Sequence, residues 1–134
     1  MYLKETTILY VEDELATQKL IKKILSRHCK EVFVASDGVE GLELYKKTNP
    51  NIVLSDIVMP NMNGIEMSAK IKELNPKQII SLFTAYSEPE LKEKASQLNI
   101  DAYIMKPLDE KQFFNSLNYL AMAFHTDLEI EGDI

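Results

Sequence analysis

The sequence predicts an α/β fold: one doubly wound parallel sheet of five strands, with five helices on its two faces. Five short β-rich segments alternate along the chain with five segments of helical periodicity. The third strand segment opens with Ile52-Val53-Leu54, and such a continuous apolar run is typical of a strand buried on both faces. A length of 134 residues suits one hydrophobic core. A single domain is therefore expected.

Two strand–helix units begin the chain. The first strand is predicted over residues 6–11 and stops at Glu12-Asp13-Glu14. A second strand is predicted over residues 32–35, and the helix after it ends before Asn49-Pro50, because the residue before a proline disfavours the helical conformation. The helix between these strands has lysines on one face and apolar residues on the other. The apolar residues are Leu15, Leu20, Ile21, Ile24 and Leu25.

The third strand, over residues 52–56, is followed by the turn residues Met59-Pro60 and Asn63-Gly64. A helix is predicted over residues 65–74, and Asn75-Pro76 directly after it marks its end. The third unit therefore carries a loop of about eight residues between its strand and its helix.

The last two units follow the same alternation. A fourth strand over residues 78–83 leads to a helix that starts near Pro89, since proline suits a first helical turn, and ends near Asn99, which tolerates a left-handed cap. A fifth strand over residues 102–105 precedes a helix from 109 to 124. The acidic tail, residues 125–134, is expected to be frayed or to begin a connection to another part of a longer protein.

Charge and composition exclude several classes of function. The net charge of -6 repels duplex nucleic acid, and Arg27 is the only arginine available for bidentate phosphate or guanine contacts. The single cysteine, Cys29, cannot form an internal disulfide and is interpreted as a structural thiol. No apolar run reaches the length of a membrane span, and the N-terminus lacks a signal-peptide core. We therefore expect a cytoplasmic protein that binds neither nucleic acid nor membrane directly.

Four of the five predicted strands end in a residue that can carry chemistry. These residues are Glu12-Asp13, Asp56, Thr84 and Lys106. Because the carboxyl ends of parallel strands meet at one edge of a sheet, these side chains are expected to share one cleft. Carboxylates 4 Å apart repel by about 4 kcal/mol at an effective dielectric constant of 20. A divalent cation removes that repulsion, and hard carboxylate oxygens suit Mg²⁺.

The same set of residues suits phosphoryl transfer. With Mg²⁺ bound, Asp56 can attack a phosphoryl group and form an acyl phosphate. Lys106 can pair with the phosphoryl oxygens, and Thr84 can donate a hydrogen bond to them. Taken singly, each residue has an ordinary structural role, such as capping a helix for Glu12-Asp13. Their joint occurrence at consecutive strand ends favours the chemical interpretation.

At these residues the chain closely resembles the receiver domain of bacterial two-component response regulators, the chemotaxis-type fold. The resemblance covers residues 6–124 and implies the flavodoxin-like strand order 2-1-3-4-5. It divides the chain into a receiver domain, 1–124, and the tail, 125–134. The matching motifs are Ile8-Leu9-Tyr10-Val11-Glu12-Asp13-Glu14, Asp56-Ile57-Val58-Met59-Pro60-Asn61-Met62-Asn63-Gly64, Thr84-Ala85 and Lys106-Pro107.

The resemblance implies that Asp56 accepts a phosphoryl group from a sensor histidine kinase or a phosphotransfer protein. It further implies that Asp13 and Asp56 bind Mg²⁺ directly, together with the backbone carbonyl of Val58, while Glu12 assists through water. No enzymatic activity is expected beyond the protein's own phosphorylation and dephosphorylation.

Signal transmission is likewise implied by the resemblance. Thr84 and Tyr103 resemble the family's switch pair, and the Lys106–Pro107 bond is expected to be cis. Phosphorylation is expected to move Thr84 toward the phosphate, to let Tyr103 rotate inward, and to change the surface of the fourth helix, fifth strand and fifth helix. That surface would control an output domain or a downstream target, with homodimerisation on phosphorylation as a further expectation. The absence of arginine from the last helix argues against the ion-paired dimer of one DNA-binding subclass.

Three alternatives stay open. A flavodoxin-like electron carrier needs a glycine- and hydroxyl-rich phosphate cradle after the first strand, where this chain has Glu12-Asp13-Glu14. A haloacid-dehalogenase-type phosphatase usually has a second aspartate two residues after the first, where this chain has Val58. A degenerate receiver would bind partners without phosphate, and the presence of Asp13, Asp56, Thr84 and Lys106 argues against it.

Overall fold

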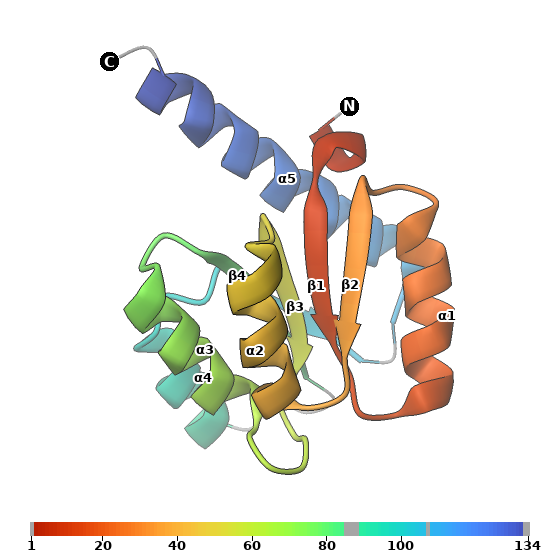
Figure 1. The fold of residues 1–134 in the computed structure, drawn as a ribbon, viewed down its shortest axis with the longest axis vertical. Helices are drawn as coiled ribbons and strands as arrows, with labels where there is room; N and C mark the ends of the chain where they lie inside the picture. The colour runs from red at the N-terminus through yellow and green to blue at the C-terminus, as the bar shows by residue number, and fades with distance from the viewer. Residues whose placement is uncertain (1, 85–88, 107, 133–134) are drawn as a thin grey trace.

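Five parallel strands form the centre of the computed structural model, which describes residues 2–84, 89–106 and 108–132 (Figure 1). The strands lie in the order β2-β1-β3-β4-β5, and all neighbouring pairs are parallel. This topology confirms the predicted fold. The strands are β1 (Thr7–Val11), β2 (Glu31–Ala35), β3 (Ile52–Asp56), β4 (Ile79–Thr84) and β5 (Ala102–Met105).

Helices cover both faces of the sheet, as a doubly wound fold requires. One face packs against α1 and α5, and the other packs against α2, α3 and α4. The helices are α1 (Leu15–Ser26), α2 (Gly38–Thr48), α3 (Gly64–Leu74), α4 (Pro89–Ser96) and α5 (Glu110–Gly132), and a short 3-10 helix, η1 (Tyr2–Glu5), precedes β1. Among the described residues, no helix is both long and apolar enough to cross a membrane.

The alternation of side chains along the strands divides the core in two. In β1, Ile8 and Tyr10 face the α1/α5 side, while Leu9 and Val11 face the α2/α3/α4 side. All five residues of β3 are buried, which agrees with the prediction from its apolar run. The central strand is therefore held on both faces, and its end is a rigid support for a side chain.

Local signals set several helix boundaries. Asp37 caps α2 through its side chain, and Asn63 with Glu66 forms a capping box at the start of α3. Asn49 ends α2 in the left-handed conformation, with φ 48°. Asn99 has φ 57° in the turn after α4, as predicted from its tolerance of a left-handed cap.

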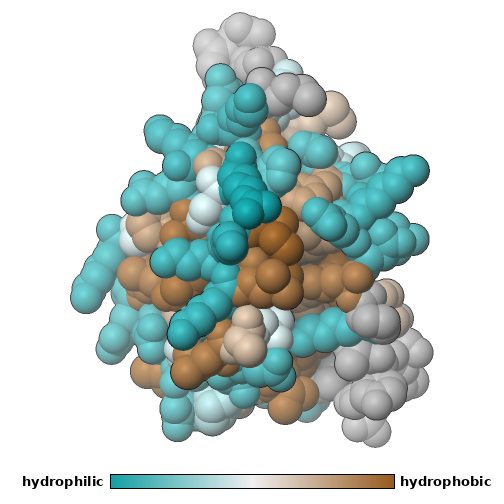
Figure 2. Space-filling view, turned by 90° about the vertical axis from the view of Figure 1, so that its right-hand side faces the viewer, coloured by the Kyte–Doolittle hydropathy of each residue, from teal (hydrophilic) through white to brown (hydrophobic). Residues whose placement is uncertain are grey.

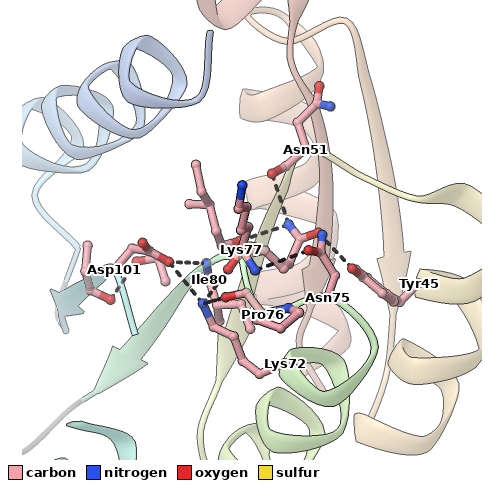
Figure 3. Close-up of polar contacts among 12 residues, drawn as sticks. Tyr45, Asn51, Lys72, Asn75, Pro76, Lys77, Ile80 and Asp101 are labelled. Atoms are coloured by element: carbon pink, nitrogen blue, oxygen red, sulfur yellow. Dashed lines mark hydrogen bonds and ion pairs between the residues drawn. The ribbon is translucent and has the colours of Figure 1, made fainter. Parts of the chain in front are cut away.

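The edge of the sheet away from the carboxyl ends is closed by a buried polar network (Figure 3). The Tyr45 hydroxyl donates to Gln78 Oε1 at 2.9 Å, and Gln78 Nε2 donates to the Asn51 carbonyl at 3.0 Å. Lys72 Nζ donates to the Gln78 carbonyl at 2.6 Å and lies 3.8 Å from Asp101 Oδ2. These groups satisfy one another, so the network fastens α2, α3 and the sheet together.

The last helix differs from the prediction. The helix was predicted to end at Phe124, before a tail expected to be frayed or to begin a connection, but α5 continues to Gly132. Contacts with η1 hold the helix at the start of this extension: the His125 ring stacks on Tyr2 with centroids 5.3 Å apart, and His125 Nε2 lies 3.3 Å from Thr6 Oγ1. Leu3 of η1 is buried in the same core as α5. The prediction missed η1, and with it the support that carries α5 past residue 124.

Candidate functional site

Three carboxylates from two strand ends meet at the carboxyl edge of the sheet. Glu12 and Asp13 follow β1, and Asp56 is the last residue of β3. Each offers an oxygen that lies within 4.8 Å of the oxygens from the other two. The structure therefore brings together the acidic residues that the sequence predicted to converge.

Lys106 joins this cluster from the end of β5. Its Nζ lies 2.6 Å from Asp56 Oδ1 and 3.9 Å from Glu12 Oε1. The Lys106 side chain is 34% exposed, so the ammonium sits at the rim of the cleft rather than in the core. One cation balances part of the charge of three carboxylates, and the remaining negative charge favours a bound cation.

Glu12 is the most enclosed acid of the site, with 2% of its surface exposed. Its carboxylate accepts hydrogen bonds from the Tyr10 hydroxyl and from the Glu14 backbone N–H, both at 3.2 Å. Burial, together with the hydrogen bond and the negative charge of the neighbouring Asp56, raises the pKa of Glu12 to about 7. Glu12 therefore holds a proton in part of the molecules near neutral pH when no cation is bound.

Gln18 supports Glu12 from α1, a role that the sequence analysis missed. Its side-chain amide donates to the Glu12 carbonyl at 2.8 Å and to the Ala35 carbonyl at 3.1 Å. Gln18 is buried although it is polar. The signal in the sequence is a glutamine on the inner face of a helix close to an acidic strand end, where a buried amide needs partners.

Asp56 has 7% of its surface exposed, while Asp13 is exposed. Of the two aspartates, Asp56 is thus the enclosed one and Asp13 the one on the solvent side. Val58, two residues after Asp56, has a side chain that is 77% exposed and makes no contribution to the core. The carboxylates fit a hard divalent cation by their chemistry, and of the described side chains Glu12, Asp13 and Asp56 lie close enough together to hold one.

The structure describes the other predicted site residues only in part. Thr84 ends β4 opposite Met105 in the register, so its backbone is at the same edge of the sheet, but its side chain lies outside the described residues. Pro107 and its predicted cis bond lie outside them too. Tyr103 lies in β5 and packs partly buried against the α2/α3/α4 core. Its hydroxyl is buried without a hydrogen-bond partner among the described residues, and burial raises its pKa.

Comparison with known proteins agrees with this geometry. Residues 8–118 match the family model described as the response regulator receiver domain. A chemotaxis protein CheY from Halobacterium salinarum is 32% identical over 87% of this chain and 97% of its own length, and one from Treponema pallidum is 39% identical over 78% and 75%.

Solved structures show the same fold. The CheY-like receiver domain protein from Methanospirillum hungatei superposes with a TM-score of 0.87 at 28% identity, covering 92% of this chain and 98% of that one. The N-terminal domain of an uncharacterized protein from Wolinella succinogenes superposes with a TM-score of 0.84 at 31% identity, again covering 92% and 98%. This chain therefore belongs to the response regulator receiver domain family of two-component systems.

Proposed function

We propose that Asp56 is the phosphoacceptor of this receiver domain. The observation that carries the proposal is the pairing of Asp56 Oδ1 with Lys106 Nζ at 2.6 Å beside the Glu12 and Asp13 carboxylates. A buried acid at a rigid strand end is held for attack, and the adjacent cation stabilises negative charge that develops on the phosphoryl oxygens.

By the resemblance to the family, Mg²⁺ would be held by Asp13 and Asp56 together with the Val58 backbone carbonyl, and Glu12 would assist. When bound, the cation offsets the negative charge of both the acid and the incoming phosphoryl group. In the transfer, an oxygen of Asp56 forms the new bond to phosphorus while the bond from phosphorus to the donor's imidazole nitrogen breaks. That nitrogen keeps the electron pair. The activity proposed is limited to this domain's own phosphorylation and dephosphorylation.

The proposed donor is a sensor histidine kinase or a phosphotransfer protein, and a groove beside Lys106 supports this part of the proposal. A cavity of about 470 Å³ runs between α1 and the start of α5, beginning at Lys106 and Glu14. Apolar side chains form its walls, including Leu20, Leu108 and Phe113. Figure 2 looks onto the α1 side and shows hydrophobic surface between charged side chains. A donor helix in this groove would contact Lys106, whose Nζ lies 2.6 Å from Asp56 Oδ1.

The output is proposed to run through α4, β5 and α5. Three apolar side chains are exposed on the last two of these elements: Met105, Tyr119 and Met122. These side chains are available for contact with a protein partner or an output domain. Thr84 and Tyr103 are the proposed switch between the phosphorylated acid and this surface.

The test is phosphorylation by a small-molecule donor. Incubation with acetyl phosphate and Mg²⁺ should add one phosphoryl group that hydroxylamine removes, as expected of an acyl phosphate, and Asp56→Asn should abolish it. Asp101→Asn is the matched control, because Asp101 lies at the opposite edge of the sheet. Undiminished labelling of Asp56→Asn would refute the assignment. Absence of labelling in the wild type would favour a degenerate receiver.

A further inference from the structure

The loop between β3 and α3 is fastened to the start of α2 by contacts that the proposed function leaves unexplained. The side-chain amide of Asn61 donates to Asp37 Oδ2 at 2.7 Å, and the Gly38 N–H donates to the Met62 carbonyl at 3.1 Å. The other oxygen of Asp37 accepts from the Glu40 N–H at 2.9 Å and caps α2. One carboxylate thus joins the β3–α3 loop to the first turn of a helix.

The backbone on both sides of this contact is shaped for it. Asn61 has φ 68°, in the left-handed region that asparagine tolerates better than most residues. A Cβ on Gly38 would lie 2.4 Å from the Met62 carbonyl oxygen, so the absence of a side chain at position 38 permits the approach. Hydrogen bonds from Glu40 N–H and Asn61 also lower the pKa of Asp37, which keeps this carboxylate charged.

The loop carries the residue whose carbonyl the proposed function assigns to the metal. Val58 is 77% exposed, so its own side chain does not hold its backbone, while its neighbours Ile57 and Met59 are buried in the α2/α3/α4 core. The loop is closed at its base by the Gly64 N–H, which donates to the Ile57 carbonyl at 2.7 Å. Its far end is held to α2 by Asn61 and Met62, and Val58 lies between these two points.

Resting on the proposed function, in which the Val58 carbonyl is a Mg²⁺ ligand, we propose that Asp37 and Asn61 are positioning residues for the metal. Their hydrogen bond holds the β3–α3 loop so that the Val58 carbonyl is presented to the cation beside Asp13 and Asp56.

The test exchanges donor and acceptor. In Asn61→Asp, the new side chain has nearly the size of asparagine and also tolerates a left-handed φ, but it places a second carboxylate against that of Asp37. The double variant D37N/N61D restores one amide and one carboxylate, and asparagine caps a helix as well as aspartate does. Mg²⁺ affinity is measured by calorimetry, and amide hydrogen exchange of residues 57–62 is measured without metal.

Asn61→Asp should raise the Mg²⁺ dissociation constant at least fivefold and speed exchange in the loop, and the double variant should return both to within about twofold of the wild type. The added negative charge alone would tighten Mg²⁺ binding. Weaker binding would therefore indicate that the β3–α3 loop has moved. Asp37→Ser, which keeps a capping oxygen but is too short to reach Asn61, should weaken binding as Asn61→Asp does. If Asn61→Asp fails to fold, Asn61→Gly takes its place, because glycine keeps the left-handed freedom without the amide.

Unchanged affinity and loop exchange in Asn61→Asp would overturn the inference, as would a loss that the double variant does not restore. Asp13→Asn separates this failure from that of the proposed function. If the wild type binds no Mg²⁺, or if Asp13→Asn leaves its affinity unchanged, the proposed metal site itself is wrong and the inference falls with it.

Discussion

Gly64 lies directly against the backbone carbonyl of Asp56: a Cβ at position 64 would be 2.1 Å from that oxygen. The same glycine donates its N–H to the Ile57 carbonyl at 2.7 Å. The first residue of α3 therefore packs on the end of β3, and the residue that carries the candidate acid cannot shift without moving the helix. Position 64 therefore needs a glycine so that α3 can approach the end of β3 closely, and not only to form the turn.

Gly64→Ala should destabilise the protein by roughly 1–3 kcal/mol, because the added methyl group meets backbone that cannot move aside. The displacement should also slow phosphorylation of Asp56. Gly41→Ala in α2 is the comparison, since the atoms nearest to its Cβ would belong to side chains, the Met67 sulfur at 2.7 Å and Val11 Cγ2 at 3.0 Å, which can shift more readily than backbone. Alanine also gains about 1 kcal/mol of helix propensity there. Denaturant unfolding of both variants measures the difference, and equal losses would contradict the argument.

The raised pKa of Glu12 predicts how stability depends on pH in the metal-free protein. Between the ordinary value of 4.5 and about 7, the folded state keeps a proton on Glu12 that the unfolded state releases. Stability should therefore fall as pH rises through this window, by up to about 3 kcal/mol from this group. Thermal unfolding of the wild type and Glu12→Gln in EDTA at several pH values checks this prediction. The stability of Glu12→Gln should depend less on pH between 4.5 and 7, and the variant should be more stable than the wild type at pH 8. Parallel curves for the two would show that Glu12 ionises normally.

Tyr103 offers a test of the buried hydroxyl. Among the described residues its oxygen has no hydrogen-bond partner, and an unsatisfied buried hydroxyl costs about 1–3 kcal/mol. Tyr103→Phe should therefore leave stability unchanged or raise it by about 1 kcal/mol in the unphosphorylated protein. Tyr10→Phe is the control: it removes a hydroxyl that donates to Glu12 at 3.2 Å, so it should destabilise. A clear loss of stability in Tyr103→Phe, measured by urea unfolding, would mean that the hydroxyl has a partner.

The sequence predicted the strands and the convergence of the acids because both follow from local signals and one topological rule. Apolar runs identify the strands, and parallel strands bring Glu12, Asp13, Asp56 and Lys106 to one edge. Contacts between side chains far apart in sequence carry no such signal. The stacking of Tyr2 on His125, which supports the end of α5, is of this kind.

The switch expectation needs refinement because Lys106 is already in place. Lys106 was expected to pair with the phosphoryl oxygens, and its Nζ already lies 2.6 Å from Asp56 Oδ1 before any phosphorylation. Little movement is left for the lysine. Thr84 is then the residue expected to move. It is the last residue of β4 and comes directly after Phe83, the partner of Asp56 in the strand register.

Thr84→Ala should separate phosphorylation from its transmission. The variant keeps Asp56, Asp13 and Lys106, so it should still accept the phosphoryl group, but it lacks the hydroxyl that would follow the new charge. A charge-assisted hydrogen bond is worth about 1.5–3 kcal/mol, a shift of roughly 10- to 150-fold in a two-state equilibrium.

Amide NMR with beryllofluoride and Mg²⁺ measures the response. The wild type should shift signals in β5 and α5, whereas Thr84→Ala should shift mainly the site. Thr84→Ser is the control, because it keeps the hydroxyl and should keep the distant response. A full response in Thr84→Ala would exclude Thr84 as the coupling residue, and Lys106→Ala would then show whether the lysine carries the coupling instead.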